Sequence, residues 1–167
     1  CLVGSEMCIR DSFKDVHGSL EFDPQSPTKL RVEASIDSKT CWTGESARDE
    51  HLRSADFLDC DRFKAIRFES AGVTQVGATD YRVTGDLTIR DVTKAATLAV
   101  RHLGAWQTPW WEGGVDKGPK LRAGFVARTQ IDRYDFGVSW NSDLPNGGIV
   151  VSRLVDIVID VEAIRED

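Results

Sequence analysis

Acidic side chains, one histidine and one cysteine are concentrated between residues 45 and 63, in the stretch ESARDEHLRSADFLDCDRF. Carboxylates, imidazoles and thiolates are the groups with which proteins hold metal ions and transfer protons. The residues that carry them here are Glu45, Asp49, Glu50, His51, Asp56, Asp59, Cys60 and Asp61. Whether they form a site depends on how the local backbone spaces them.

Residues 43–54, TGESARDEHLRS, predict a short helix. Ser46 and Asp49 have the spacing of a capping box, and Asp49 and Arg53 have that of an i,i+4 ion pair. A metal ion shared on a helix needs ligands three or four residues apart, and no ligand lies at those offsets from His51. Asp49 and His51 face different sides of the helix, which argues against an acid–base pair; a partner from a distant strand stays open. We expect the helix to cover one end of the fold.

Length and composition exclude several classes of protein. The 167 residues fit one domain. A formal net charge of -6 has the wrong sign for a phosphate-binding surface, such as one for nucleic acid, and for an anionic-membrane surface. No apolar run approaches the roughly 20 residues of a membrane-spanning helix, so we expect a soluble protein without stable membrane insertion. Cys41 and Cys60 have a spacing that fits either a disulfide or two free thiols.

After residue 12, apolar and polar side chains alternate with a period of two, as they do in strands with one buried face. In KLRVEASID, residues Leu30, Val32, Ala34 and Ile36 share one phase. The pattern recurs in seven runs, which cover residues 14–23, 29–37, 65–70, 81–90, 94–102, 121–133 and 155–163. Turns separate them, and we predict the longest loop at 107–119, QTPWWEGGVDKGP. The fold class is therefore all-β, an antiparallel meander that must close or sandwich itself to hide its edges.

Small side chains occupy several inward positions of these runs, among them Ala34, Ser70, Gly85, Ala96 and Ala127. Protein interiors pack to a density of about 0.75, and a barrel of about eight strands is just wide enough for one small ligand. We therefore expect an unfilled apolar lumen that takes a hydrocarbon chain, at about 0.8 kcal/mol per buried CH2. The alternative is an ordinary filled core.

The other candidate groups do not assemble a catalytic centre. His17 falls on the outward phase, and His102 ends a strand on the inward phase, where it would join a lid network or meet a ligand head group. We expect no enzyme activity and no metal site. Two alternatives stay open: an enzyme that acts on a lipid head group at the barrel mouth through His51, His102 or Asp49, and a filled barrel that serves as an interaction module. Trp110 and Trp111 would either pack over the barrel edge or meet a lipid source.

Four segments, in order, resemble the YceI-like family of lipid-binding barrels. They are ARDEHLRSADFLD (47–59), YRVTGDLTIRDVTKAATL (81–98), RAGFVARTQIDRYDFGVSWN (122–141) and GGIVVSRLVDIVIDVEAIR (147–165). The resemblance implies an extended lipocalin-like antiparallel β-barrel of about eight strands with a short helical insertion. Its elongated hydrophobic cavity would take a polyisoprenoid or a fatty-acyl amphiphile, and no catalytic activity or cofactor is implied.

The same resemblance gives roles to two motifs. Arg48 and Asp49 fall in the helix motif, and Arg133, Asp135 and Phe136 fall in the R-x-DFG motif. These residues would organise the helix and one strand end, with Phe136 at the cavity.

The sequence departs from the family pattern in two places. Asp91 stands where the family has a glycine, and residues 1–11 stand where the family has its first strand. We expect residues 1–11 to be a non-native segment and residues 12–165 to form the barrel. One sheet edge would then be open to homodimerisation or aggregation. The remainder is more similar to unexported members, so we expect a cytoplasmic rather than a periplasmic protein.

The inward phase, and for Phe136 the resemblance, predict which side chains contact the ligand. They are Val32, Ala34, Ile36, Phe68, Val83, Leu87, Leu98, Val100, Phe125, Ala127, Ile131, Phe136, Ile157 and Ile159. The predicted function is the non-catalytic binding, sequestration or transport of a long-chain isoprenoid or similar amphiphilic lipid.

Overall fold

The computed structural model describes residues 11–23, 26, 29–142 and 150–166; of the segment 1–11 that we expect to be non-native, only Asp11 is among them. β-strands dominate the described part, with one α-helix and two short 3-10 helices, Ser38–Thr40 and Arg133–Phe136. The other elements are β1 (Ser12–Phe13), β2 (Val16–Glu21), β3 (Arg31–Asp37), β4 (Cys41–Trp42), α1 (Ser46–Arg53), β5 (Ala65–Gln75), β6 (Asp80–Ile89), β7 (Val92–Glu112), β8 (Val115–Asp132) and β9 (Leu154–Ile164).

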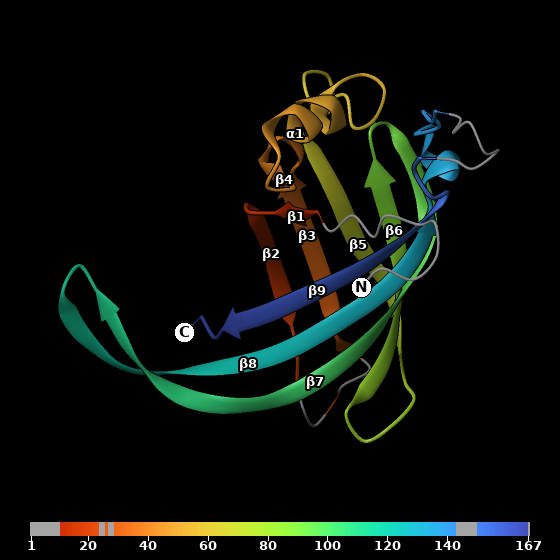
Figure 1. Ribbon diagram of the computed structural model, residues 1–167. Helices are drawn as coiled ribbons and strands as arrows, with labels where there is room; N and C mark the ends of the chain where they lie inside the picture. The colour runs from red at the N-terminus through yellow and green to blue at the C-terminus, as the bar shows by residue number, and fades with distance from the viewer. Residues whose placement is uncertain (1–10, 24–25, 27–28, 143–149, 167) are drawn as a thin grey trace, which may run out of the picture.

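Seven strands form one curled antiparallel sheet in the order β2-β3-β5-β6-β7-β8-β9, and β1 pairs with β4 beside it. Each of the seven alternating runs is a strand of this sheet, so the all-β class, the antiparallel meander and the single short helix are confirmed. The sheet is a half-barrel: within the described ranges no ladder joins β2 to β9, and these two strands are its edges (Figure 1). The curl follows from the right-handed twist of the strands.

A bulge in β5 keeps its apolar side chains on the inner face. The register with β6 shifts between Ser70 and Gly72, so that Ser70 lies opposite Gly85 and Val73 lies opposite Val83. Because successive side chains of a strand point to opposite faces, the extra residue brings Val73 to the face that Ser70 occupies. The strand therefore presents one apolar face to the interior, although its alternation changes phase along the way.

Segment 107–119, which the sequence predicts to be a loop, lies instead in the long hairpin of β7 and β8. Gly113 and Gly114 form its two-residue turn with φ of 58° and 81°, values that glycine adopts without steric cost. Pro109 lies opposite Pro119, so the two residues without an N–H share one position of the ladder. Proline and glycine usually mark loops. Here the glycines form the tight turn, and the two prolines lie opposite each other in the ladder.

Helix α1 and the turn after it cover one end of the half-barrel, as predicted (Figure 1). The predicted capping box of Ser46 and Asp49 is wrong, because Glu45 is the N-cap and makes no side-chain cap bond. Asp49 instead accepts hydrogen bonds from the backbone N–H and the Oγ1 of Thr43, both at 2.7 Å. Arg53 donates to a backbone carbonyl of β4 at 2.6 Å. These bonds fix α1 to the strand that precedes it.

The core is one cluster that spans the middle strands and the underside of α1. Its buried members are Leu30, Phe57, Ile66, Phe68, Val83, Leu87, Ile89, Leu98, Ala127, Phe136 and Val138. Cys41 and Cys60 are buried free thiols rather than a disulfide. Burial raises the pKa of the Cys41 thiol to about 12, so this group stays neutral at physiological pH.

Arg133 ties the end of β8 to the segments that follow it. Its guanidinium is buried, with the residue 5% exposed, and within the described part of the chain it donates to backbone carbonyls. The acceptors are Ser152 (2.8 Å), Val138 (2.8 Å), Trp140 (2.9 Å) and Val151 (3.2 Å). Five N–H donors in a planar fork allow one side chain to serve all four acceptors.

We expect Gly85→Ala to lower the free energy of unfolding by about 1–3 kcal/mol, as overpacking does. A Cβ at this position would lie 2.3 Å from the carbonyl oxygen of Glu69 and 2.7 Å from the ring of Phe68. Urea unfolding measures the effect. Gly72→Ala is the matched control on the neighbouring strand, since its nearest contact would be the Oγ1 of Thr84 at 3.2 Å. Equal stabilities of the two variants would contradict the prediction.

A second expectation concerns Arg133→Lys, which keeps the charge but removes the planar fork. Because several buried carbonyls lose their donor, the free energy of unfolding should fall by about 2–4 kcal/mol. Arg153→Lys is the control: its side chain is 60% exposed and pairs with Asp132, so it should change stability by less than about 1 kcal/mol. Thermal or urea unfolding of both variants measures the two losses. Equal losses would contradict the structural role assigned to Arg133.

Candidate functional site

The candidate site is the apolar inner face of the curled sheet. The strand register fixes its composition: Val100, Ala127 and Ile159 oppose one another across β7, β8 and β9, and Ala34 opposes Phe68 across β3 and β5. Directly opposed side chains of antiparallel strands point to the same face. The predicted inward phase is therefore correct in each strand of the sheet.

The predicted ligand-contacting residues differ in how deeply they lie. Phe68, Val83, Leu87, Leu98, Ala127 and Phe136 belong to the buried core cluster, and Val32, Ile36, Val100, Ile131 and Ile159 pack against it half-buried. Phe125 is buried at 4% exposure, and Ala34 and Ile157 are half-buried. The structure thus brings them together on one face, and their contact with a lipid stays a prediction.

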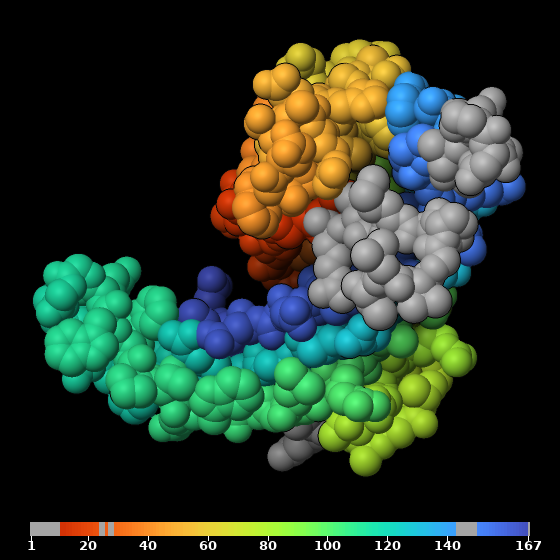
Figure 2. All heavy atoms as spheres, viewed as in Figure 1, coloured from red at the N-terminus to blue at the C-terminus, as the bar shows by residue number. Residues whose placement is uncertain are grey.

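Exposure of the inner face rises from the middle of the sheet toward its two edges. In β6 at the centre, Tyr81 is 5% and Val83 0% exposed. In the edge strands, Val16 of β2 is 49% exposed, and Val155 and Val161 of β9 are 37% and 38% exposed. The space-filling view shows the surface hollowed between the red N-terminal strands and the blue β9 (Figure 2). The inner face is therefore accessible from the open side of the half-barrel.

The small inward side chains make room for the protein's own aromatic rings. The ring of Phe68 lies over Gly85, where a Cβ would be 2.7 Å from it. The Oγ of Ser70 accepts a hydrogen bond from the backbone of Val32 at 2.8 Å, which satisfies a polar group on the inner face. The centre of the half-barrel is thus packed by the protein's own side chains, in place of the expected enclosed lumen. The inward apolar surface that stays exposed, around Val16 on β2 and Val155 and Val161 on β9, is called the cleft here.

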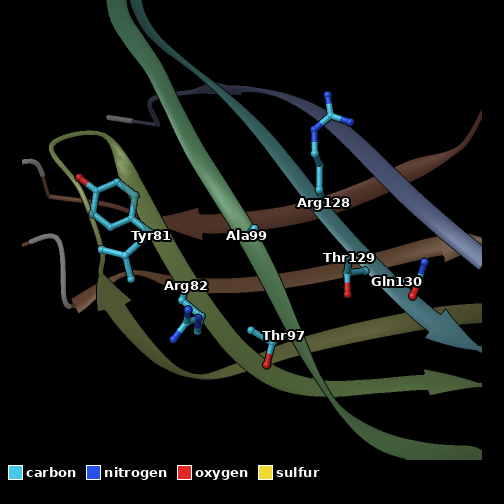
Figure 3. Close-up of a pocket in the computed structure, with 8 residues that line it drawn as sticks. Tyr81, Arg82, Thr97, Ala99, Arg128, Thr129 and Gln130 are labelled. Carbon is cyan, nitrogen blue, oxygen red and sulfur yellow. The ribbon is translucent and has the colours of Figure 1, made fainter.

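Two pockets of about 280 Å³ each lie outside this cleft. One is on the outer face, where Arg82 and Arg128 flank Ala99 on neighbouring strands (Figure 3). The other is on the β7–β8 hairpin, and its walls include Lys117, Lys120 and Arg165. Lys117 and Lys120 fall in or beside the predicted loop, so the alternation of the strands gave no signal for them.

The candidate catalytic groups lie at opposite ends of the half-barrel. His51, on α1, is 3.0 Å from a carboxylate oxygen of Asp56, and its ring contacts Phe57 and Trp140 at centroid distances of 5.0 and 4.5 Å. Asp49, on the same helix, is held by Thr43, and the hydrogen bond from the Thr43 hydroxyl lowers the pKa of its carboxyl. These groups bind to their neighbours within the cap that α1 forms.

His102 lies at the other end, where its backbone N–H donates to Thr79 in the β5–β6 turn. Its imidazole faces inward, with the rings of Phe22 and Phe125 each at a centroid distance of 5.0 Å. Its Nε2 is buried and has no hydrogen-bond partner among the described residues. The described part of the chain also places no three His, Cys, Asp or Glu side chains close enough to hold a metal ion.

Comparison with known proteins gives a consistent family. Residues 3–163 match the model of the YceI-like domain. A UPF0312 protein of Azotobacter vinelandii is 34% identical over 155 residues, which are 93% of this chain and 73% of the relative. Protein YceI of Escherichia coli O17:K52:H18 is 36% identical over 155 residues, again 93% and 73%.

Solved structures share the fold at lower identity. A YceI protein of Campylobacter jejuni has a TM-score of 0.81 at 22% identity, with 100% of this chain and 91% of that chain covered. BcnA of Burkholderia cenocepacia has a TM-score of 0.72 at 21% identity, with 92% and 86% covered. No helix in the described ranges is long and apolar enough to span a bilayer.

Replacing Thr43 by Val should raise the pKa of Asp49 toward its ordinary value of 3.8, because the strongest hydrogen bond to the carboxylate is lost. A lowered folded-state pKa contributes stability above the ordinary value and loses it as the pH falls through the folded-state pKa. The wild-type advantage over Thr43→Val should therefore be largest at neutral pH and shrink below 3.8.

Carboxyl NMR titration and urea unfolding at several pH values measure both effects. Thr84→Val is the control, since its hydroxyl donates to the carbonyl of Gly72 and touches no carboxylate. A pKa of Asp49 that stays low in Thr43→Val would refute this assignment.

Proposed function

The chain belongs to the YceI-like family, and we propose that it binds one long-chain isoprenoid or similar amphiphilic lipid along its inner face and sequesters or carries it without chemistry. The observation that carries this proposal is the exposed apolar surface on the inward side of both edge strands. Val16, Val155 and Val161 face the interior by register, yet each remains more than a third exposed.

The energetics favour a hydrocarbon chain as the group that covers this surface. Burying a valine-sized side chain contributes about 1.5–3 kcal/mol, and the half-buried Ile157 and Ile159 extend the surface along β9. Opposed to these residues on β8 are Thr129 and Ala127, which add no charge to the face. A long, uncharged, apolar cleft of this kind matches a chain of methylene or isoprene units better than a polar substrate.

The arrangement of polar groups supports binding without catalysis. Catalysis by acid and base needs the two groups within about 3 Å of the reacting atoms, whereas Asp49 and His51 lie in the α1 cap and His102 lies at the far end. Each of the two groups in the cap already has a partner within the cap. The proposed role is therefore a carrier or a reservoir for one lipid.

Native mass spectrometry of the protein purified from cells, followed by extraction and identification of the bound molecule, tests the proposal directly. We expect a copurified lipid with one long apolar chain. Protein that is folded, purified without detergent and free of lipid would refute it.

Val161→Asp should reduce the copurified lipid by at least about tenfold, because a carboxylate would be buried against the chain without a partner. Val158→Asp is the matched control: it changes the same residue type on the same strand, but Val158 faces outward and is 51% exposed. Both sites are exposed, so both variants should fold, as circular dichroism can verify. Ala127→Trp is less suitable, because Ala127 is buried and the larger side chain would disturb the packing of the core. Equal lipid content in the two Asp variants would remove the inner face of β9 from the binding surface.

A further inference from the structure

The distal part of the β7–β8 hairpin, residues 103–124, projects from the half-barrel and is called the arm here (Figure 1). The ladder between β8 and β9 ends at Arg122 and Ile164, so beyond this pair the arm is a two-stranded ribbon. Figure 2 shows the ribbon extending free of the remaining strands. Isolated hairpins are only marginally stable in water, and a surface that covers this one would stabilise it.

The arm exposes large apolar side chains that a free ribbon would normally avoid. Leu103 is 57%, Trp106 43%, Trp111 62%, Val115 57% and Leu121 37% exposed. These side chains lie on both faces of the ribbon, and exposed apolar surface beyond single scattered residues marks interaction sites. Tryptophan, with an apolar ring and an N–H donor, is the side chain that gathers at the boundary between membrane and water.

The charge of the arm is opposite to that of the chain. Lys117, Lys120 and Arg122 outnumber Glu112 and Asp116 within the arm, whereas the whole chain carries a formal charge of -6. Arg122 pairs with a carboxylate of β9, but the two lysines form no ion pair with any described residue. They share a pocket of about 280 Å³ with Arg165, which is likewise unpaired among the described residues. An anionic surface would therefore be attracted to the arm and repelled by the rest of the molecule.

One face of the arm continues the inner face of the half-barrel. His102 lies opposite Phe125 at the base, and beyond the bulge at Leu103 the next inward pair is Ala105 and Ala123. The ladder then leads to Leu121, beside the basic pocket. Apart from Gln107, which lies opposite Leu121, this track carries small and apolar side chains from the cleft to the cationic end of the arm, which favours a lipid source over a protein partner.

We propose that the arm docks on the surface of an anionic lipid bilayer, with its tryptophans at the interface and its lysines on the lipid head groups. This inference rests on the proposed function, because docking places the open cleft next to its lipid supply. Each basic residue near an anionic surface strengthens binding by about fivefold, and this contribution falls with salt.

Cosedimentation with vesicles tests the proposal on the full chain. We expect the protein to sediment with vesicles of phosphatidylcholine and phosphatidylglycerol in equal parts, and to stay in solution with pure phosphatidylcholine. Trp106→Ser with Trp111→Ser, and separately Lys117→Gln with Lys120→Gln, should each weaken binding by about 10-fold or more.

Matched controls lie elsewhere on the surface. Trp42→Ser removes a tryptophan that is 48% exposed on β4. Arg82→Gln with Arg128→Gln removes two cations from the outer face that form no ion pair with a described residue. Both should sediment like the wild type. The variants change exposed side chains, apart from the half-buried Lys120, and circular dichroism verifies their fold.

Three outcomes would overturn the proposal: wild-type protein that ignores the anionic vesicles, arm variants that bind like the wild type, and controls that lose binding as the arm variants do. Light scattering tests whether a second copy of the chain covers the arm instead. That would be the case if the arm variants convert a dimer to monomers and leave vesicle binding unchanged. Copurified lipid, measured on the same samples, separates the two proposals. Lipid-loaded protein that ignores vesicles refutes docking alone, and lipid-free protein that docks refutes the carrier function.

Discussion

The structure depends on keeping one apolar face turned inward along seven strands. The side-chain period of a strand is two, so one extra residue would turn the rest of that strand inside out. At the β5 bulge after Ser70, the alternation of inward and outward side chains changes phase, so that Val73 lies opposite Val83 on the inner face. The β7 bulge at Leu103 does the same at the base of the arm and brings Ala105 to the inward side. The inner face is continuous from the core to the arm because both bulges are present.

Packing on that face explains why it forms a cleft rather than a tunnel. Glycine and serine on the inner face of β5 and β6 admit the ring of Phe68, so the middle of the sheet is closed by its own side chains. Within the described ranges, β2 and β9 each pair with a neighbour on one side only, and their inward valines remain in contact with solvent. The accessible apolar surface is therefore a consequence of the free edges, and the small residues contribute by letting the centre pack tightly.

Alternation alone predicts the seven strands and the inward residues, because burial of one face imposes it directly on the sequence. The arm could not be predicted in the same way: Pro109, Pro119 and the two glycines of its turn carry the local signals of a loop, and only the pairing across the hairpin accommodates them. The capping of α1 fails for a similar reason. Asp49 has the spacing of a capping partner, but its carboxylate reaches back to Thr43, a contact that tertiary structure selects.

The two ends of the half-barrel differ in chemistry, and this difference gives the cleft a polarity. At the α1 end, Asp49 is satisfied by Thr43 and the rings of His51, Phe57 and Trp140 pack together, although the Nε of Arg53 is buried there without a partner among the described residues. At the other end, the buried Nε2 of His102 lacks a partner among the described residues, and Lys117 and Lys120, which form no ion pair with a described residue, lie further out on the arm. Under the proposed function, we expect a bound amphiphile to place its polar end toward the arm and its chain toward α1, because the reverse orientation would bury a head group against the rings of the α1 cap.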